Sequence, residues 1–356
     1  MRRFLQMAIL IGMLVAACAA PAAERASAPS AAPAQPAGTG GTAPPPTNTG
    51  GSLAAPAAGP HQHLGIGTSS PSLSYLPAKL ADMLGYYAEE GLDPEFVQVR
   101  GNSVIPALLA GELDFTTLLS AIGAHASQGG PSKIVQFHSV RLQHVLTVRP
   151  EITDISQMAG KRIGVESLGT LTAFESRKLI DHFGLPDVAI VAVGGDLERI
   201  AAMESNAVDA STSAVPSNIV AEKRGFPTLL RIGAILEIPQ AGFGGPETLL
   251  REQPDKVARS LRAAARALPL IQSQRDLVIQ KIGEWMELSP EDATRAYELV
   301  ADTYSPNGLP TDAQMAAYLD LMRATAGAPA DAKPSDVADF TIARRVAAEL
   351  GLPGAP

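Results

Sequence analysis

The sequence predicts a two-lobed α/β fold in which each lobe is a mostly parallel sheet flanked by helices. Short β-rich runs alternate with helical patterns from about residue 61 onward, which is typical of α/β layers. This part of the chain is longer than a single hydrophobic core usually supports, so two lobes are expected. Two pairs of segments also recur in the same order, which indicates two similarly built halves.

The first half of this body contains strands and helices in alternation. Gly91 and Gly111 follow its two helical patterns and are suited to end them. The predicted elements are a strand over 63–67, a helix over 71–90, a strand over 95–99, a helix over 103–110, and strands over 114–119 and 134–140.

The second half repeats this alternation, and the C-terminal third is expected to be helical. The starts at 289–292 and 311–314 resemble capping boxes, which open helices. The predicted elements of the second half are a strand over 162–165, a helix over 171–183, a strand over 188–193, a helix over 197–205 and a strand over 208–211.

Two internal matches support the paired lobes. Residues 105–117 align with 200–212, and each segment is a helix end, a Gly or Asn, and an Asp that opens a strand. A looser match aligns 64–69 with 163–168, both strands leading into a helix through Gly and Ser or Thr. The two offsets are similar, about 95–99 residues, as expected of a repeat.

The N-terminus has the pattern of an export signal. A basic start precedes a short apolar run and the single cysteine of the chain, Cys18. The run 14–18, Leu-Val-Ala-Ala-Cys, resembles a bacterial lipobox, which implies cleavage before Cys18 and a thioether-linked lipid on its sulfur. The alternative is an uncleaved membrane span, because the apolar stretch approaches the ~17–25 residues that a span needs.

Residues 18–60 are expected to form a disordered linker, since Ala, Pro, Gly, Ser and Thr dominate and bury little apolar surface. Directly after Cys18, this linker would hold the folded body away from a lipid surface. With one cysteine, no disulfide can form within the chain. The net charge of −8 and the lack of a basic run with interleaved aromatics argue against nucleic acid as a partner.

The turns after the predicted strands are the candidate ligand site, because open α/β sheets bind ligands beyond the carboxyl ends of their strands. Hydroxyl groups and helix N-termini there suit a small anionic or polar ligand. The alternative is plain helix capping, for which Ser, Thr and Asn are the usual residues. The candidate residues are Ser69, Ser70, Asn102, Ser103, Ser120, Gly169 and Thr170.

The chain lacks the common catalytic motifs, so no enzyme activity and no cofactor are expected. The pair His61 and His63 lies at the edge of the linker, and we expect no metal site there. His138 and His144 flank Arg141 near the expected lobe junction. We expect these two histidines to be structural or solvent-facing, with contact to a ligand as the alternative.

Three segments resemble the nitrate/sulfonate/taurine/thiamine-precursor family of ABC-transporter substrate-binding proteins. The run 76–93 resembles its first helix, with the ending Gly-Tyr-Tyr-Ala-Glu-Glu-Gly-Leu. Residues 107–115 resemble its second signature, and residues 158–165, Met-Ala-Gly-Lys-Arg-Ile-Gly-Val, resemble the opening of its second lobe. The likeness covers about residues 63–320.

The resemblance implies a periplasmic-binding-protein-like fold of type II with a ligand enclosed between two lobes. The implied organisation is a signal peptide over 1–17, the lipid-anchored linker over 18–60, lobe 1 from 61–147 and 240–356, and lobe 2 from 148–239. We expect the chain to cross between the lobes twice, near 145–150 and near 236–242, and we call these segments the crossings. Tyr75, on the first helix, is a further ligand candidate.

The resemblance also implies partners and a location. The expected partners are a small-molecule ligand, an ABC permease and its ATPase, with the membrane reached through the lipid on Cys18 and the protein itself a monomer. The location is the periplasm or the outer face of the cytoplasmic membrane. The stretch 70–75 does not identify one ligand subfamily. An enzyme on the same fold and a ligand-sensing lipoprotein remain alternatives.

Overall fold

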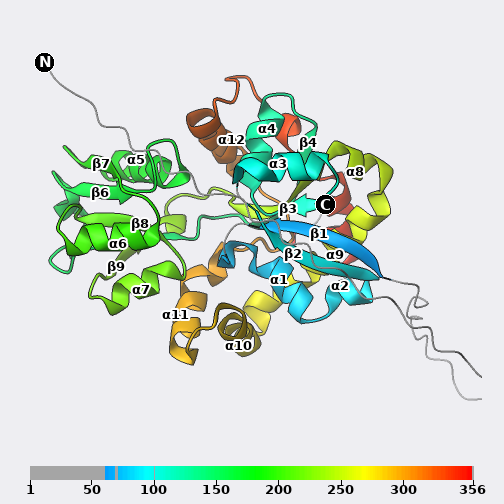
Figure 1. The fold of residues 1–356 in the computed structure, drawn as a ribbon, viewed down its shortest axis with the longest axis horizontal. Coiled ribbons are helices and arrows are strands. Elements are labelled where there is room, and N and C mark those ends of the chain that lie inside the picture. The colour runs from blue at the N-terminus through cyan, green and yellow to red at the C-terminus, as the bar shows by residue number, and fades with distance from the viewer. Residues whose placement is uncertain (1–60, 69–70, 100, 355–356) are drawn as a thin grey trace, which may run out of the picture. The chain divides into compact units, whose positions relative to one another are not determined.

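The computed structural model describes residues 61–68, 71–99 and 101–354, and within these residues the strands form two five-stranded sheets. The predicted signal peptide, Cys18 and the predicted linker lie outside the described residues. Figure 1 shows the two sheets with helices on their faces. None of the described helices is both long and apolar enough to cross a membrane.

The first sheet has the order β2-β1-β3-β10-β4. β1 pairs in parallel with both β2 and β3, whereas β10 is antiparallel to both of its neighbours. Four of its five strands therefore run in one direction, and β10 runs in the other. The strands are β1 (Gln62–Thr68), β2 (Leu92–Gln98), β3 (Phe115–Thr116), β4 (Ser132–Ser139) and β10 (Ala241–Pro246).

The second sheet repeats this topology, with the order β7-β6-β8-β5-β9. Here β5 is antiparallel to both neighbours and takes the place that β10 has in the first sheet. The two-lobed α/β prediction is confirmed, and each sheet is mixed because one strand runs against the other four. The strands are β5 (His144–Val148), β6 (Arg162–Val165), β7 (Ala189–Ala192), β8 (Ala210–Ala214) and β9 (Thr228–Arg231).

Two aspartates make equivalent hydrogen bonds in the two lobes, as expected of a repeat. The Asp114 carboxylate accepts from the Gly65 N–H at 2.9 Å, and the Gly65 carbonyl accepts from the Asp114 N–H at 2.9 Å. Asp209 makes the same reciprocal pair with Arg162, again at 2.9 Å for both bonds. Each aspartate therefore ties the start of a strand to the neighbouring central strand, as the aligned segments predict.

The structure shifts the alignment of residues 64–69 with 163–168 by two residues. Ile66 lies opposite Phe115 in the first sheet, and Ile163 lies opposite Ala210 in the second. Ile66 is therefore the counterpart of Ile163, whereas the sequence alignment paired it with Val165. A shift of two keeps the same side chains on the same face of a strand, which is why the pattern alone did not reveal it.

The first lobe differs from the prediction in two places. Gly85 adopts a φ of 77°, which only glycine takes up easily, and it splits the helix predicted over 71–90 into shorter pieces. The predicted strand over 114–119 ends at Thr116, because Leu119 already opens a helix that the sequence analysis missed. The helices are η1 (Leu73–Tyr75), α1 (Leu76–Met83), α2 (Tyr86–Glu89), α3 (Gly101–Leu109) and α4 (Leu119–Ser127).

The second lobe follows the prediction closely. α5 spans Leu171–Phe183 as predicted and ends at Gly184, whose N–H bonds back to the last helical turn. Because β5 already belongs to the second sheet, the first crossing lies at residues 140–143 and precedes the predicted 145–150. The remaining helices are η2 (Ile155–Met158), α6 (Asp196–Glu204), α7 (Ser217–Lys223) and η3 (Ile232–Ala234).

The C-terminal third is helical and contacts both lobes. α9 packs against α1, α2 and α14 in the first lobe, whereas α12 contacts α5 and α11 contacts α7 in the second. The C-terminal helices therefore connect the two lobes. The helices are α8 (Glu247–Glu252), α9 (Pro254–Ser273), α10 (Arg275–Met286), α11 (Pro290–Val300), η4 (Ala301–Thr303), α12 (Asp312–Ala326), α13 (Pro334–Val337) and α14 (Thr341–Glu349).

Candidate functional site

A cavity of about 790 Å³ lies between the two sheets and is lined from both lobes. Its walls are the segments that follow β1, β3, β6, β7 and β8, together with the crossings near His144 and Gln240. These are the carboxyl ends of the strands, where ligands bind in open α/β sheets. The volume is within the range of small-molecule sites.

The first-lobe wall begins with a capped turn. Ser72 caps η1 by accepting from the Ser74 N–H at 3.3 Å, and the two hydroxyls lie 2.9 Å apart. Tyr75 follows with 4 % of its surface exposed, and its ring meets Trp285 edge-on at 5.4 Å. Burial raises the pKa of Tyr75, so its hydroxyl stays neutral.

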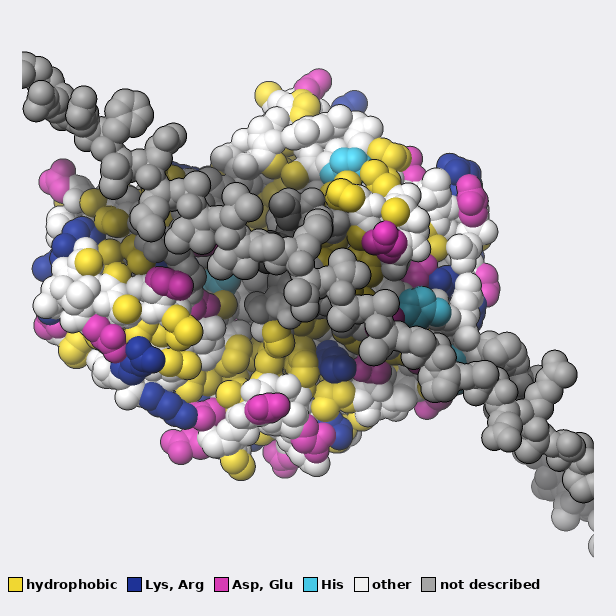
Figure 2. Space-filling model, in the orientation of Figure 1, with side chains coloured by type: hydrophobic (Ala, Val, Ile, Leu, Met, Phe, Trp, Pro, Cys, Tyr) yellow, Lys and Arg dark blue, Asp and Glu magenta, His cyan; other side chains and the backbone are white. Residues whose placement is uncertain are grey.

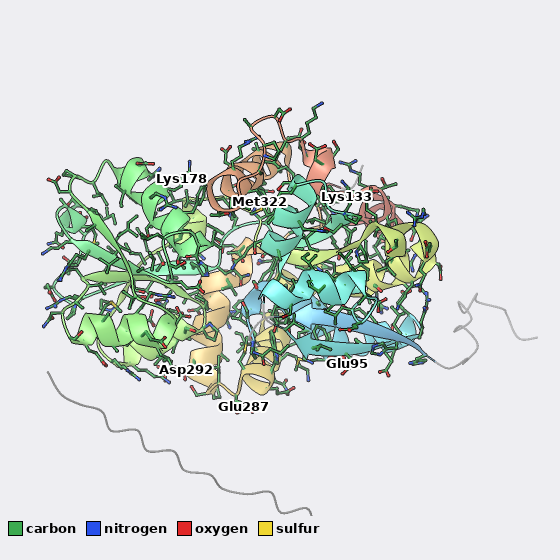
Figure 3. All side chains as sticks on the ribbon, turned by 45° about the horizontal axis from the view of Figure 1, so that its top comes forward. Glu95, Lys133, Lys178, Glu287, Asp292 and Met322 are labelled. Atoms are coloured by element: carbon green, nitrogen blue, oxygen red, sulfur yellow. The ribbon has the colours of Figure 1, made fainter. Side chains whose placement is uncertain are left out.

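A second part of this wall is apolar and comes from α4 and α12. The Tyr318 hydroxyl donates to the Leu119 carbonyl at 2.6 Å, which fixes the two helices against each other. Leu321 and Met322 add apolar surface to the cavity from α12. Figure 3 marks Met322 on α12 and Lys178 on α5, the two helices that face each other across the lobes.

The second-lobe wall is a polar turn at the start of α5. The Thr170 hydroxyl donates to the Ser167 carbonyl at 2.8 Å, and the Thr172 hydroxyl accepts from the Glu166 N–H at 3.0 Å. Thr170 occupies the N-cap position of α5 but its side chain makes no capping bond to the helix. The turn is held by its own hydroxyls, and the start of α5 faces the cavity.

Charged groups of the cavity wall come from the second lobe. His144 pairs with Glu175, with Nδ1 2.7 Å from Oε1, and Arg199 pairs with Asp196. Glu166 also lines the cavity and makes no ion pair with a described residue. Figure 2 shows acidic and basic side chains interspersed on the visible face, without a basic patch of the kind that binds nucleic acid.

The structure places four of the predicted site residues in the cavity wall, and their contact with a ligand stays a prediction. Ser103 is exposed on α3 and is not part of the wall. Ser69, Ser70 and the side chain of Asn102 lie outside the described residues. The four residues in the wall are Tyr75, Ser120, Gly169 and Thr170.

Sequence analysis missed Glu166, Asp196 and Arg199 of the wall, and it did not pair His144 with Glu175. Asp196 and Arg199 are three residues apart at the start of α6, a spacing that brings side chains together on a helix. For His144, contact with a ligand was the alternative to a structural or solvent-facing role; the residue lines the cavity, and its contact with a ligand stays a prediction. Its partner Glu175 is 31 residues away in another element, so no local pattern could have joined them.

A resident metal ion has no clear place among the described residues. No group of three or more His, Cys, Asp or Glu side chains gathers anywhere in this part of the chain. His63 lies 3.8 Å from the Glu95 carboxylate, which makes a surface ion pair when the imidazole is protonated.

The two sheets, each with one antiparallel strand and with a cavity between them, define a periplasmic-binding-protein fold. The profile of the NMT1/THI5-like family matches residues 74–276, and the chain belongs to that family. No curated relative matches the chain by sequence.

Solved structures with low sequence identity share the fold. A putative periplasmic sulfonate-binding protein of a sulfonate ABC transporter from Methylobacillus flagellatus is 16 % identical, with a TM-score of 0.67 over 83 % of this chain and 97 % of that chain. The periplasmic nitrate-binding protein NrtA from Synechocystis is 13 % identical, with a TM-score of 0.61 over 82 % and 89 %. A DSZB mutant in complex with biphenyl-2-sulfinic acid is 16 % identical, with a TM-score of 0.61 over 81 % and 99 %.

Proposed function

We propose that this chain is the extracytoplasmic solute-binding component of an ABC importer and encloses a small polar or anionic ligand between its lobes. The observation that carries the proposal is the cavity of about 790 Å³ lined by both lobes at the carboxyl ends of their strands. The family and the sulfonate- and nitrate-binding neighbours support it. The ligand classes are sulfonate, nitrate, taurine, pyrimidine and carboxylate.

The proposal includes a lipid anchor and a transport partnership. Residues 1–17 would be cleaved, Cys18 would carry the lipid, and residues 18–60 would tether a monomeric body at the membrane surface. An ABC permease and its ATPase would receive the ligand. The lobes are proposed at 61–147 with 240–356 and at 148–239, and the sheet membership of β5 favours a start of the second lobe at His144.

Thermal unfolding in the presence of candidate ligands tests the binding function. A ligand at about 100 times its Kd stabilises the folded protein by about 2.7 kcal/mol, which is seen as a shift of several degrees. The probes are methanesulfonate, nitrate, 2-aminoethanesulfonate, benzoate and 4-aminopyrimidine. No shift with any of these probes would contradict the proposed ligand classes.

A pair of tryptophan variants locates the binding. Ser120 is an exposed residue of the cavity wall, and Ser120→Trp should fill the cavity and remove the ligand-induced shift. Ser205 is exposed at the end of α6 and outside the wall, so Ser205→Trp should keep the shift. An unchanged shift in the Ser120 variant would place the ligand elsewhere.

Metabolic labelling tests the anchor. Palmitate should be incorporated into the wild-type protein and not into Cys18→Ala, because the thiol is the acceptor of the lipid. A broad protease should then release a stable core by cutting in residues 19–60. Equal labelling of both proteins would exclude the lipobox.

A further inference from the structure

His144 stands at the first position of β5, where the chain has just crossed into the second lobe, and it lines the cavity. Its side chain is 12 % exposed, and the side chain of its partner Glu175 is fully buried at 0 %. The imidazole Nδ1 lies 2.7 Å from Glu175 Oε1 and 2.9 Å from Oε2. Both carboxylate oxygens therefore face one ring nitrogen.

This contact decides which edge of the ring is available. A carboxylate accepts hydrogen bonds, so Nδ1 carries the proton that Glu175 binds. The other nitrogen, Nε2, makes no hydrogen bond within the part of the chain that the structure describes. His144 lines the cavity, and with Nδ1 held by Glu175, Nε2 is the ring nitrogen left for a ligand.

A role in stabilising the fold alone does not account for the pairing of His144 with Glu175. A fully buried carboxylate is costly unless it is paired, and the only partner of Glu175 among the described residues is His144. An apolar pair would fill the same space at lower cost. Glu175 instead fixes Nδ1 by a hydrogen bond and leaves Nε2 for a ligand. A hydrogen bond to one ring nitrogen sets the role of the other nitrogen in functional histidines in the same way.

The surrounding charges keep the imidazole protonated over a wider pH range. Burial alone would lower the pKa of His144, but the charge and the hydrogen bond of Glu175 outweigh burial and raise it. Asp196 raises it further, and Arg199, held by Asp196, opposes this. Glu166 is the remaining charged group of this wall.

We propose that His144 anchors the ligand, with its Nε2–H donating a hydrogen bond to an oxyanion of the ligand and Glu175 as the positioning residue. The inference rests on the proposed binding function and adds the group that the ligand must present: a sulfonate, carboxylate or similar oxygen acceptor. Since Glu175 balances the imidazolium, the pair is neutral, and recognition depends on the direction of the N–H bond.

The first arm of the test measures affinity for methanesulfonate, benzoate and nitrate by calorimetry. His144→Phe keeps a ring but removes the donor, and it should weaken binding by about 10- to 100-fold, the value of a hydrogen bond to a charged group. His182→Phe is the matched control, because His182 is exposed on α5 and outside the cavity wall. It should leave the affinity unchanged.

The second arm measures the pH dependence of binding and the imidazole titration by NMR. The wild-type protein should bind the anions best below the raised pKa of His144 and lose affinity as the pH rises through it. Glu175→Gln should shift both the titration and the loss of affinity to lower pH. A role in stability alone would change the melting temperature without moving this pH profile.

The outcomes separate the two proposals. If the wild-type protein binds a probe and His144→Phe binds it equally well, the anchoring role is wrong while the binding function stands. If no probe binds the wild-type protein and none shifts the His144 resonances, both are contradicted. A probe-induced shift of the His144 Nε2 resonance together with weakened binding in the Phe variant supports the anchor.

Discussion

Glu166 is the residue of the cavity wall whose charge has no ionic partner among the described residues, in contrast to Asp196, which pairs with Arg199. An unpaired carboxylate there repels an anion and attracts an amino group. We expect Glu166→Gln to strengthen binding of ethanesulfonate and to weaken binding of 2-aminoethanesulfonate. Glu166 is exposed, so each change should be about fivefold, corresponding to ~1 kcal/mol between two charges about 4 Å apart in water.

The two probes differ only in the amino group, so opposite signs identify the charge of Glu166 as the cause. Glu112→Gln serves as the control, because Glu112 is exposed in the first lobe and does not line the cavity. Changes of the same sign for both probes would mean that the variant alters the shape of the cavity and not its charge.

His138 gives a prediction about stability and pH. The side chain is fully buried, and burial lowers the pKa of His138 to about 3. Above pH ~6.5 the group is neutral in both states and has no effect. As the pH falls from there towards 3, the unfolded chain takes up a proton that the folded protein refuses, so stability is lost at up to about 1.4 kcal/mol per pH unit.

The measurement compares the free energy of unfolding at pH 7 and pH 5 in the wild type and in His138→Leu. The loss of stability between the two values should be smaller in the variant by about 2 kcal/mol. Leucine keeps an apolar contact with Phe243, which the imidazole meets edge-on at 4.7 Å, and removes the contact of Nε2 with Gln136 Oε1 at 3.2 Å. An equal loss in both proteins would mean that His138 titrates near its usual pKa when folded.

At the scale of elements, the sequence predicted what is coded locally. α5 has the predicted bounds because Gly184 ends it in the left-handed conformation, and both aspartates of the repeat make their strand-tying bonds. The turns in the cavity wall could be predicted because open α/β sheets bind ligands beyond the carboxyl ends of their strands. The pair of His144 and Glu175 could not be predicted, since it depends on how α5 packs against a strand far away in the sequence.

α4 was missed for a different reason. Its buried residues Leu119, Ile122 and Ala126 do have helical spacing, but small residues and Gly123 between them weaken the pattern. Gly123 is there because α12 approaches closely: a Cβ at this position would meet the Tyr318 hydroxyl and the Met322 sulfur. The packing of α4 against α12 therefore requires a glycine at position 123, and this glycine weakens the helical pattern of α4 in the sequence.

Gly123→Ala should therefore destabilise the protein, although alanine is the better helix former. The added methyl forces α12 or α4 to shift, at a cost of about 1–3 kcal/mol measured by denaturant unfolding. Because Met322 lines the cavity, ligand affinity should fall as well. The control is Gly283→Ala in α10, where the nearest atom is 3.5 Å away and about 0.5–1 kcal/mol of stabilisation is expected.

At the scale of the whole folded body, ion pairs join the second lobe to the C-terminal helices. Lys223 of α7 pairs with Asp292 of α11, Glu222 pairs with Arg295 at 3.0 Å, and Arg231 of β9 donates to Asp302 at 2.7 Å. Most of these side chains are partly exposed, so each pair contributes little to stability. Together they mark where the second lobe contacts the C-terminal helices, and a hinge motion of the lobes is expected to alter these contacts.

Locking this contact tests whether the lobes move when the ligand binds. Lys223→Cys and Asp292→Cys, in a soluble form with Cys18→Ser, leave two thiols for a short bismaleimide, because Cys18 is the only native cysteine. We expect the crossings to act as hinges, so in small-angle scattering the radius of gyration of the unlinked protein should fall when a bound probe closes the lobes. The linked protein should show no such change, and the same variant without linker is its control. A ligand-induced decrease that persists after linking would contradict hinge closure about these crossings.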